Sequence, residues 1–317
     1  MKKFLKFVWG VFAVIGILST AGIISLLDGK TTIDMDTLYD ADADSWTKAL
    51  AIGKLVASNI PHDNQDEWPK HVNAIGLWEL SYPSGYTSGE ILLDVLYEDI
   101  SYNKVLSLPI QSPLLKTDGE PVMVQVPSLD DLLGDKLTAF APHTTGIPFF
   151  KGEKPFSMEI MKQLFDISSI LDRTDTLEVV RSTFGKIVPI ELGYRGLDEL
   201  SAEDVLSDAY NTAMNICLYG ALDRQEYTWL TSGAHRVNGF ILTENYAMER
   251  AVRDAAKVAY LARLLQLGIN EVRHYTPADD AALATEVIED QTLNKLNRLK
   301  KVNTEAFFYC RRLEELR

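Results

Sequence analysis

Two acidic residues, Asp34 and Asp36, are separated by a single residue in a segment where apolar and polar residues alternate. In a β-strand, side chains two residues apart point to the same face and lie about 7 Å apart along the strand. Such a carboxylate pair suits Mg²⁺, a hard ion that prefers oxygen ligands and bridges a protein to a triphosphate. The spacing predicts Asp34 and Asp36 as metal ligands and catalytic residues of nucleotidyl transfer. A solvated strand edge that binds no metal would show the same spacing.

A turn of small residues spans positions 16–22, ahead of the acidic pair, and a short apolar helix is expected at 23–27. The backbone N–H groups of a turn at a helix N-terminus, together with a hydroxyl group, can hold the phosphates of a nucleotide. The residues predicted to bind the nucleotide are Ser19, Thr20, Lys30 and Thr32.

Asp94 is a charged residue inside the apolar strand segment 91–96. A charge in such surroundings needs a partner or a metal ion. Asp94 is therefore a candidate third carboxylate, either as a ligand or as the base that accepts the proton of an attacking hydroxyl. Glu98, four residues later on the same face, is its rival. An ordinary edge-strand charge is the alternative for Asp94.

Two further charged side chains lie on consecutive expected helices. Lys136 lies on the helix that Ser128 begins, with Asp131 three residues later as a capping-box variant. By itself, Lys136 would be an exposed helix lysine. Asp166 lies on the next helix, where its ordinary role would be an ion pair with Lys162 one turn earlier.

The elements that must position these residues change in kind along the chain. Strands are expected at 31–38, 74–82, 90–98 and 122–126, and helices at 46–58, 128–140 and 157–171. Strand patterns then fade, and helices are expected at 202–222, at 245–267 and from 277 onward. The sequence predicts an α+β chain with a mixed α/β domain over residues 1–175 and a helical C-terminal domain over residues 176–317.

The order of turn, helix and Asp-x-Asp strand resembles the DNA-polymerase-β-like nucleotidyltransferases. Residues 124–140 resemble more narrowly the AbiEii/AbiGii toxin family, in which a strand and a Pro-Ser cap precede a helix with a Lys-Leu-x-Ala motif, here beginning at Lys136. Where the family carries Arg-Asp-x-x-Asp, this chain has Lys162, Gln163 and Asp166. The resemblance covers about residues 12–172.

This resemblance implies a fold with a mixed sheet and flanking helices, and a Mg²⁺-dependent nucleotidyltransferase that transfers a nucleotide from an NTP to an acceptor hydroxyl and releases pyrophosphate. Lys136 would contact the nucleotide phosphates, and Asp166 would orient Lys136 or the acceptor. The resemblance also implies the toxin of a type IV-like toxin–antitoxin, or abortive infection, system. Its acceptor would be RNA, notably tRNA ends, and its protein partner a cognate antitoxin.

Two departures from the family pattern keep a second hypothesis open. Ser19 and Thr20 stand where the family usually carries a Gly-Gly or Gly-Ser pair, and Gln163 replaces an aspartate. A catalytically inactive binding protein that kept the nucleotidyltransferase fold would show the same departures.

The net charge of −14 repels a nucleic acid, so an RNA partner requires a local basic patch. The candidate residues lie near the C-terminus; they are Lys295, Arg298, Lys300, Lys301, Arg311 and Arg312. The alternative for this group is the solvated face of a terminal helix. Of the histidines, which show no metal-binding spacing, His143 is the one expected closest to the site.

The N-terminal segment and the two cysteines indicate in which cellular compartment the protein is expected. Residues 4–27 are largely apolar and could form a membrane anchor, which would make the chain a membrane-anchored helical protein. Gly10, Gly16 and Gly22 favour instead a buried strand, a turn and a helix. Cys217 and Cys310 are interpreted as buried thiols of a reducing compartment. We therefore expect a cytoplasmic protein with no stable membrane association.

Overall fold

The computed structural model describes residues 6–7, 71–78, 89–96, 101–111, 119–241 and 245–317. By its internal contacts the chain divides into two compact units. The first unit comprises residues 1–100 and 111–119, and the second comprises residues 101–110 and 120–317. The turn at 16–22, the strand at 31–38 and the helix at 46–58 lie outside the described residues.

The described part of the first unit is an antiparallel sheet in the order β1-β3-β2. Its strands are β1 (Lys6–Phe7), β2 (His71–Trp78) and β3 (Gly89–Leu96). The register pairs His71 with Leu96 and Trp78 with Gly89, so β2 and β3 run side by side over their full length. This confirms the strand pair expected at 74–82 and 90–98, shifted by a few residues toward the N-terminus.

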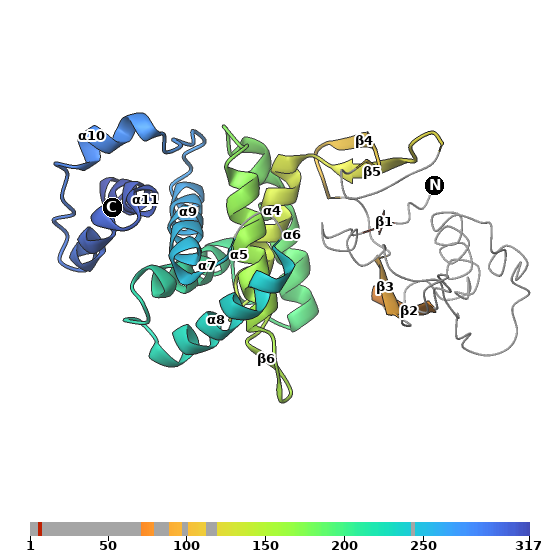
Figure 1. Ribbon diagram of the computed structural model, residues 1–317. Coiled ribbons are helices and arrows are strands. Elements are labelled where there is room, and N and C mark those ends of the chain that lie inside the picture. The colour runs from red at the N-terminus through yellow and green to blue at the C-terminus, as the bar shows by residue number, and fades with distance from the viewer. Residues whose placement is uncertain (1–5, 8–70, 79–88, 97–100, 112–118, 242–244) are drawn as a thin grey trace, which may run out of the picture. The chain divides into compact units, whose positions relative to one another are not determined.

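The second unit begins with an antiparallel pair, β4 (Val105–Pro109) and β5 (Met123–Pro127), which leads into helix α4 (Leu129–Ala139) (Figure 1). The side chain of Ser128 accepts a hydrogen bond from the backbone N–H of Asp131 and so caps α4, as the sequence predicts. A short hairpin, β6 (Phe150–Lys151) and β7 (Lys154–Pro155), then precedes α5.

Four long helices follow that pair. They are α5 (Ser157–Leu171), α6 (Glu178–Arg195), α7 (Ala202–Cys217) and α9 (Met248–Gln266). The helices α5, α7 and α9 confirm the expected ones, and Ser201 caps α7 in a capping box with Asp204. Helix α6 was not expected, because Pro189 and two glycines, Gly185 and Gly193, interrupt its helical pattern.

A further helix, α8 (Arg224–Val237), was also missed, and it leads into the short 3₁₀ turn η2 (Asn238–Phe240). Its buried face consists of Leu230, Gly233, Ala234 and Val237. Small residues form half of that face, so the sequence carries little apolar periodicity there.

The single helix expected from residue 277 to the C-terminus is wrong. The structure has instead η3 (Pro277–Asp279), α10 (Asp280–Leu283), the 3₁₀ helix η4 (Asn294–Lys301) and α11 (Thr304–Glu315). Asn303 caps α11, since its side chain accepts a hydrogen bond from the N–H of Ala306. The expected helix is therefore interrupted because Asn303 begins a new helix within residues 277–317.

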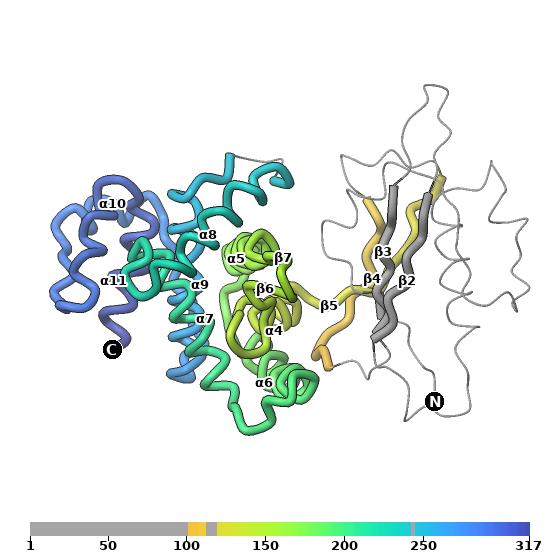
Figure 2. The backbone as a smooth tube through the Cα atoms, turned by 90° about the horizontal axis from the view of Figure 1, so that it is seen from below, coloured from red at the N-terminus to blue at the C-terminus, as the bar shows by residue number. Residues whose placement is uncertain are grey.

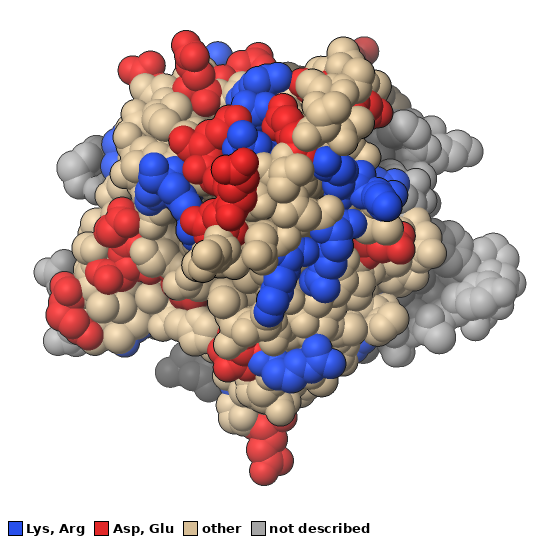
Figure 3. All heavy atoms as spheres, turned by 90° about the vertical axis from the view of Figure 1, so that its left-hand side faces the viewer, with Lys and Arg blue, Asp and Glu red and all other residues tan. Residues whose placement is uncertain are grey.

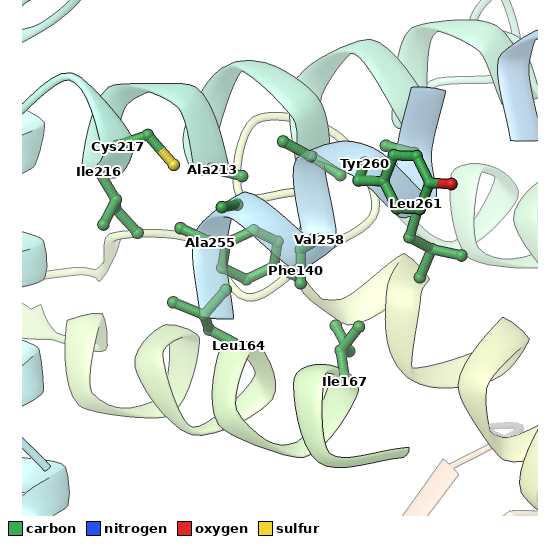
Figure 4. Close-up of a cluster of buried hydrophobic side chains, with 14 of the residues drawn as sticks. Phe140, Leu164, Ile167, Ala213, Ile216, Cys217, Ala255, Val258, Tyr260 and Leu261 are labelled. Atoms are coloured by element: carbon green, nitrogen blue, oxygen red, sulfur yellow. The ribbon is translucent and has the colours of Figure 1, made fainter. Parts of the chain in front are cut away.

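Helix α9 lies at the centre of the second unit, where it packs against α5, α7 and α11 (Figures 1 and 2). Phe140, Leu164, Ala213 and Val258 belong to one buried cluster (Figure 4). Helices α4 and α5 thus share a core with α6, α7 and α9. The expected boundary after residue 175 falls inside this unit, and a separate helical C-terminal domain stays a prediction.

In the part of the chain that the structure describes, no helix combines the length and apolar character needed to cross a membrane. The apolar segment 4–27 lies outside the described residues except for Lys6 and Phe7.

Candidate functional site

The predicted site residues fall into three groups. Those outside the described residues are Ser19, Thr20, Lys30, Thr32, Asp34 and Asp36. Asp94 lies in β3, where the register pairs it with Asn73 of β2. Lys136 and Asp166 lie in the second unit, on α4 and α5, and the structure brings these two side chains together.

The ammonium of Lys136 donates a hydrogen bond to Oδ2 of Asp166 at 2.7 Å, and a longer one to Oε1 of Gln163 at 3.4 Å. Gln163 and Asp166 are three residues apart on α5 and face α4 together. The side chain of Lys136 is 13% exposed and that of Asp166 is 7% exposed. Asp166 is thus buried under α4, and the ion pair with Lys136 compensates its buried charge.

A second lysine, Lys162, lies within electrostatic range of the same carboxylate. Burial lowers the pKa of Lys162; the carboxylates of Asp166 and Glu159 oppose this change, and Lys136 adds to it. Two carboxylates and a second ammonium group thus act on Lys162. Ammonium groups held in such a cluster can donate charge-assisted hydrogen bonds to the oxygens of a phosphate group.

The N-terminal end of α4 is held by Asp131, whose side chain is fully buried. It accepts hydrogen bonds from the backbone N–H groups of Asn103 (2.7 Å) and Lys104 (3.0 Å), and from the hydroxyls of Ser128 and Thr183 (both 2.6 Å). Burial alone would raise the pKa of Asp131, but these hydrogen bonds hold it below the ordinary value. The network fastens α4 to β4 and α6, one and a half turns before Lys136.

Asp135, the neighbour of Lys136, accepts a hydrogen bond from the hydroxyl of Tyr102. Burial and the Asp135 charge raise the pKa of that phenol, so it stays a donor. No local pattern predicts these partners, because Tyr102 and Asn103 lie about thirty residues before their acceptors on α4.

Helix α5 is anchored on its other side by Ser168, whose hydroxyl donates to Oδ1 of Asp254 on α9 at 2.8 Å. Asp254 is fully buried, and Arg253 donates to the same oxygen. Burial raises the pKa of Asp254 despite these donors. The helix that carries Asp166 is therefore fixed by polar contacts on two sides.

His143 lies in a second polar cluster, formed with α7 and α8. Its Nδ1 lies 2.7 Å from Asp208 Oδ1, and its Nε2 lies 2.7 Å from Glu226 Oε1. The hydrogen bond with Asp208 is the main cause that raises the pKa of His143 to about 9, while partial burial opposes it. A hollow of about 300 Å³ beside this cluster is lined by His143, Asn211, Thr212, Asn215, Leu222, Asp223 and Glu226.

Among the described residues, no group of three or more His, Cys, Asp or Glu side chains is arranged to hold a metal ion. Both cysteines are buried and free, as expected.

A sequence model of the family described as nucleotidyl transferase AbiEii toxin, type IV TA system, matches residues 31–231. The chain belongs to this family. The AbiEii match contains Asp34, Asp36, Asp94, Lys136 and Asp166 and ends within α8. No curated protein and no solved structure matches the chain.

Membership of the AbiEii family confirms the family predicted from the sequence, and with it the nucleotidyltransferase class and the toxin–antitoxin setting. A type IV toxin of this family implies a cognate antitoxin as its partner. Ser19, Thr20 and Lys30 precede the matched region, so their role rests on the local turn pattern alone.

Proposed function

We propose that this AbiEii protein transfers a nucleotide from an NTP to an acceptor hydroxyl, in a Mg²⁺-dependent reaction that releases pyrophosphate. The observation that carries the proposal is the contact of Lys136 with Asp166, with Lys162 beside them. These are the positions at which the AbiEii resemblance expects a phosphate-binding lysine and its positioning carboxylate.

The paired lysines supply electrostatic stabilisation. Negative charge develops on the leaving pyrophosphate during nucleotidyl transfer, and a preorganised ammonium group stabilises that charge most strongly where water is scarce. Asp166 acts as a positioning residue, because its hydrogen bond fixes the direction in which the Lys136 ammonium points. Lys162 adds a second positive charge beside this contact.

Asp34 and Asp36 are assigned to the metal. Two carboxylates separated by a single residue offer only oxygen donors, which fits Mg²⁺. When bound, Mg²⁺ would neutralise part of the triphosphate charge and align the reacting phosphate. Asp94 is assigned as the base that accepts the proton of the acceptor hydroxyl, and the turn containing Ser19, Thr20, Lys30 and Thr32 as the phosphate-binding loop.

The acceptor that we propose is RNA, notably a tRNA end, as the resemblance implies. The cognate antitoxin would control access to this reaction. The protein is proposed to act in the cytoplasm, in keeping with its free thiols.

The test is transfer of isotope from each labelled NTP to total RNA in the presence of Mg²⁺. We expect transfer by the wild-type chain, and loss of at least about a hundredfold on Asp36→Asn and on Lys136→Met, since each removes a charge that acts on the reacting phosphates. Lys151→Met, an exposed lysine of the β6–β7 hairpin, is the control and should keep full activity.

The second candidate, an inactive binding protein, is favoured by Gln163 and by the Ser19-Thr20 turn. It predicts no transfer to any acceptor from any NTP. Retained binding of NTP in calorimetry, with no transfer, would replace the enzyme proposal with this one.

A further inference from the structure

The segment before α11 carries a three-residue repeat. Residues 293–303 read LNKLNRLKKVN, with an aliphatic residue at every third position. This repeat coincides with η4, a 3₁₀ helix of eight residues. A 3₁₀ helix has three residues per turn, so side chains three apart lie in line, and runs longer than about four residues are uncommon.

The repeat sorts the side chains of η4 onto separate edges. Leu293, Leu296 and Leu299 are buried in the core of the second unit. The basic ridge, which we define as Lys295, Arg298 and Lys301, is exposed along another edge. With a rise of about 2 Å per residue, the backbone positions of its members follow one another at about 6 Å along the helix axis.

The charges of the basic ridge are not neutralised by the described carboxylates. Other basic residues of the C-terminal group are paired: Arg311 lies 3.0 Å from Glu314, and Arg312 lies 2.6 Å from Glu315. Within the described ranges, Lys295, Arg298 and Lys301 form no such pair. The group predicted from sequence therefore divides into neutralised arginines on α11 and open cations on η4.

Arg298 is supported by an aromatic ring that leaves its charge in place. The guanidinium carbon lies 4.0 Å from the centroid of the Tyr219 ring. Tyr219 has φ 56° and is the one described residue other than glycine with a positive φ. A glycine would adopt this left-handed conformation without strain, so the ring is retained here at a cost.

We propose that the basic ridge binds the phosphate backbone of the RNA acceptor, a proposal that rests on the proposed function. Cationic side chains that repeat along one edge of a helix suit the repeating phosphates of a nucleic-acid strand, whereas an acidic protein surface has no such regular repeat. On the face shown in Figure 3, Lys and Arg side chains form separate groups between carboxylates. That mixed surface favours a narrow contact with one strand.

The test measures binding of a fluorescein-labelled oligouridine RNA to the full chain by anisotropy, over a series of salt concentrations. In the ridge variant, Lys295, Arg298 and Lys301 are each changed to Gln. We expect its affinity to fall at least about tenfold. The slope of log K against log salt should fall by about 2, since each phosphate contact on a single strand contributes about 0.7.

The matched control changes three other exposed cations, Lys151, Lys154 and Arg173, to Gln, which alters the net charge equally. It should keep the wild-type slope. The proposal is overturned if wild-type protein does not bind the RNA, or if the ridge variant and the control bind alike. Isotope transfer separates the two proposals: RNA binding that depends on the ridge, without any transfer, refutes the proposed function only.

A second variant addresses Tyr219. Tyr219→Gly suits the left-handed backbone but removes the ring that supports Arg298, so RNA affinity should fall. Tyr219→Phe keeps the ring and should keep RNA affinity. Equal RNA affinity of the Gly and Phe variants would contradict the role given to Tyr219 beneath Arg298.

Discussion

The ion pair between Lys136 and Asp166 allows a quantitative prediction. At 2.7 Å and with exposures of 13% and 7%, the pair lies near the buried limit, where removal of one partner costs about 3 kcal/mol of folding free energy. The two partners are not equivalent. Asp166→Asn leaves Lys136 and Lys162 without a shared carboxylate, whereas Lys136→Met leaves Asp166 beside Lys162. We expect Asp166→Asn to cost about 3 kcal/mol and Lys136→Met about half of that.

The assay is urea unfolding of the two single variants and the double variant. The double variant should cost less than the sum of the single variants by about 1–2 kcal/mol, because each substitution removes the same contact. An equivalent cycle on the exposed pair of Arg312 and Glu315 is the control and should give less than about 1 kcal/mol. Additive costs at Lys136 and Asp166, or an equal cost for the two single variants, would refute the reasoning.

Three further predictions concern the helices around the site. Asp131→Ala should lower the free energy of unfolding by about 3 kcal/mol or more in urea, because it leaves several buried donors without an acceptor; a loss below about 1 kcal/mol would contradict this. The pKa of His143 rises from about 6.5 in the unfolded chain to about 9 in the folded one, so the stabilisation it provides is complete below pH 6.5 and is lost as pH rises through 9. The difference in unfolding free energy between wild type and His143→Gln should therefore shrink over that window, and a constant difference would disprove this role. Gly233→Ala should destabilise the protein by about 1–3 kcal/mol, since the added Cβ on α8 would overlap the carbonyl of Ser157. The matched Gly185→Ala on α6 meets open space and should stabilise the protein by up to about 1 kcal/mol. Thermal melts that rank the two variants the other way would count against this packing.

Local signals were predictable from the sequence. Ser128 starts its helix as predicted, because a cap needs only its own residue and the next three. The strands β2 and β3 were also predicted, since two apolar segments flank a turn-rich segment. Helix α6 was not, because Pro189 and Gly185 reduce helix propensity, which packing against α4 and α7 overrides.

Contacts between distant residues were the part that could not be predicted. The burial of Asp166 depends on α4, thirty residues away, and the network of Asp131 draws on Asn103 and Thr183. The family resemblance predicted Lys136 and Asp166 as residues of the same site, but it did not predict the distance between their side chains. The metal pair Asp34 and Asp36 stays a prediction.

The rotation of helix α5 about its axis couples the ion pair of Lys136 and Asp166 to a polar contact in the core. Asp166 and Ser168 are separated by about 200° around the helix, so they face nearly opposite directions. A turn of α5 that moved Asp166 away from Lys136 would also pull Ser168 off the buried Asp254. The contacts of Asp166 and Ser168 together therefore fix the rotation of α5 about its axis. Substitutions in the core near Asp254 should change the direction of the Lys136 ammonium without contacting Lys136, so this region of the core is constrained by the orientation of α5 as well as by packing.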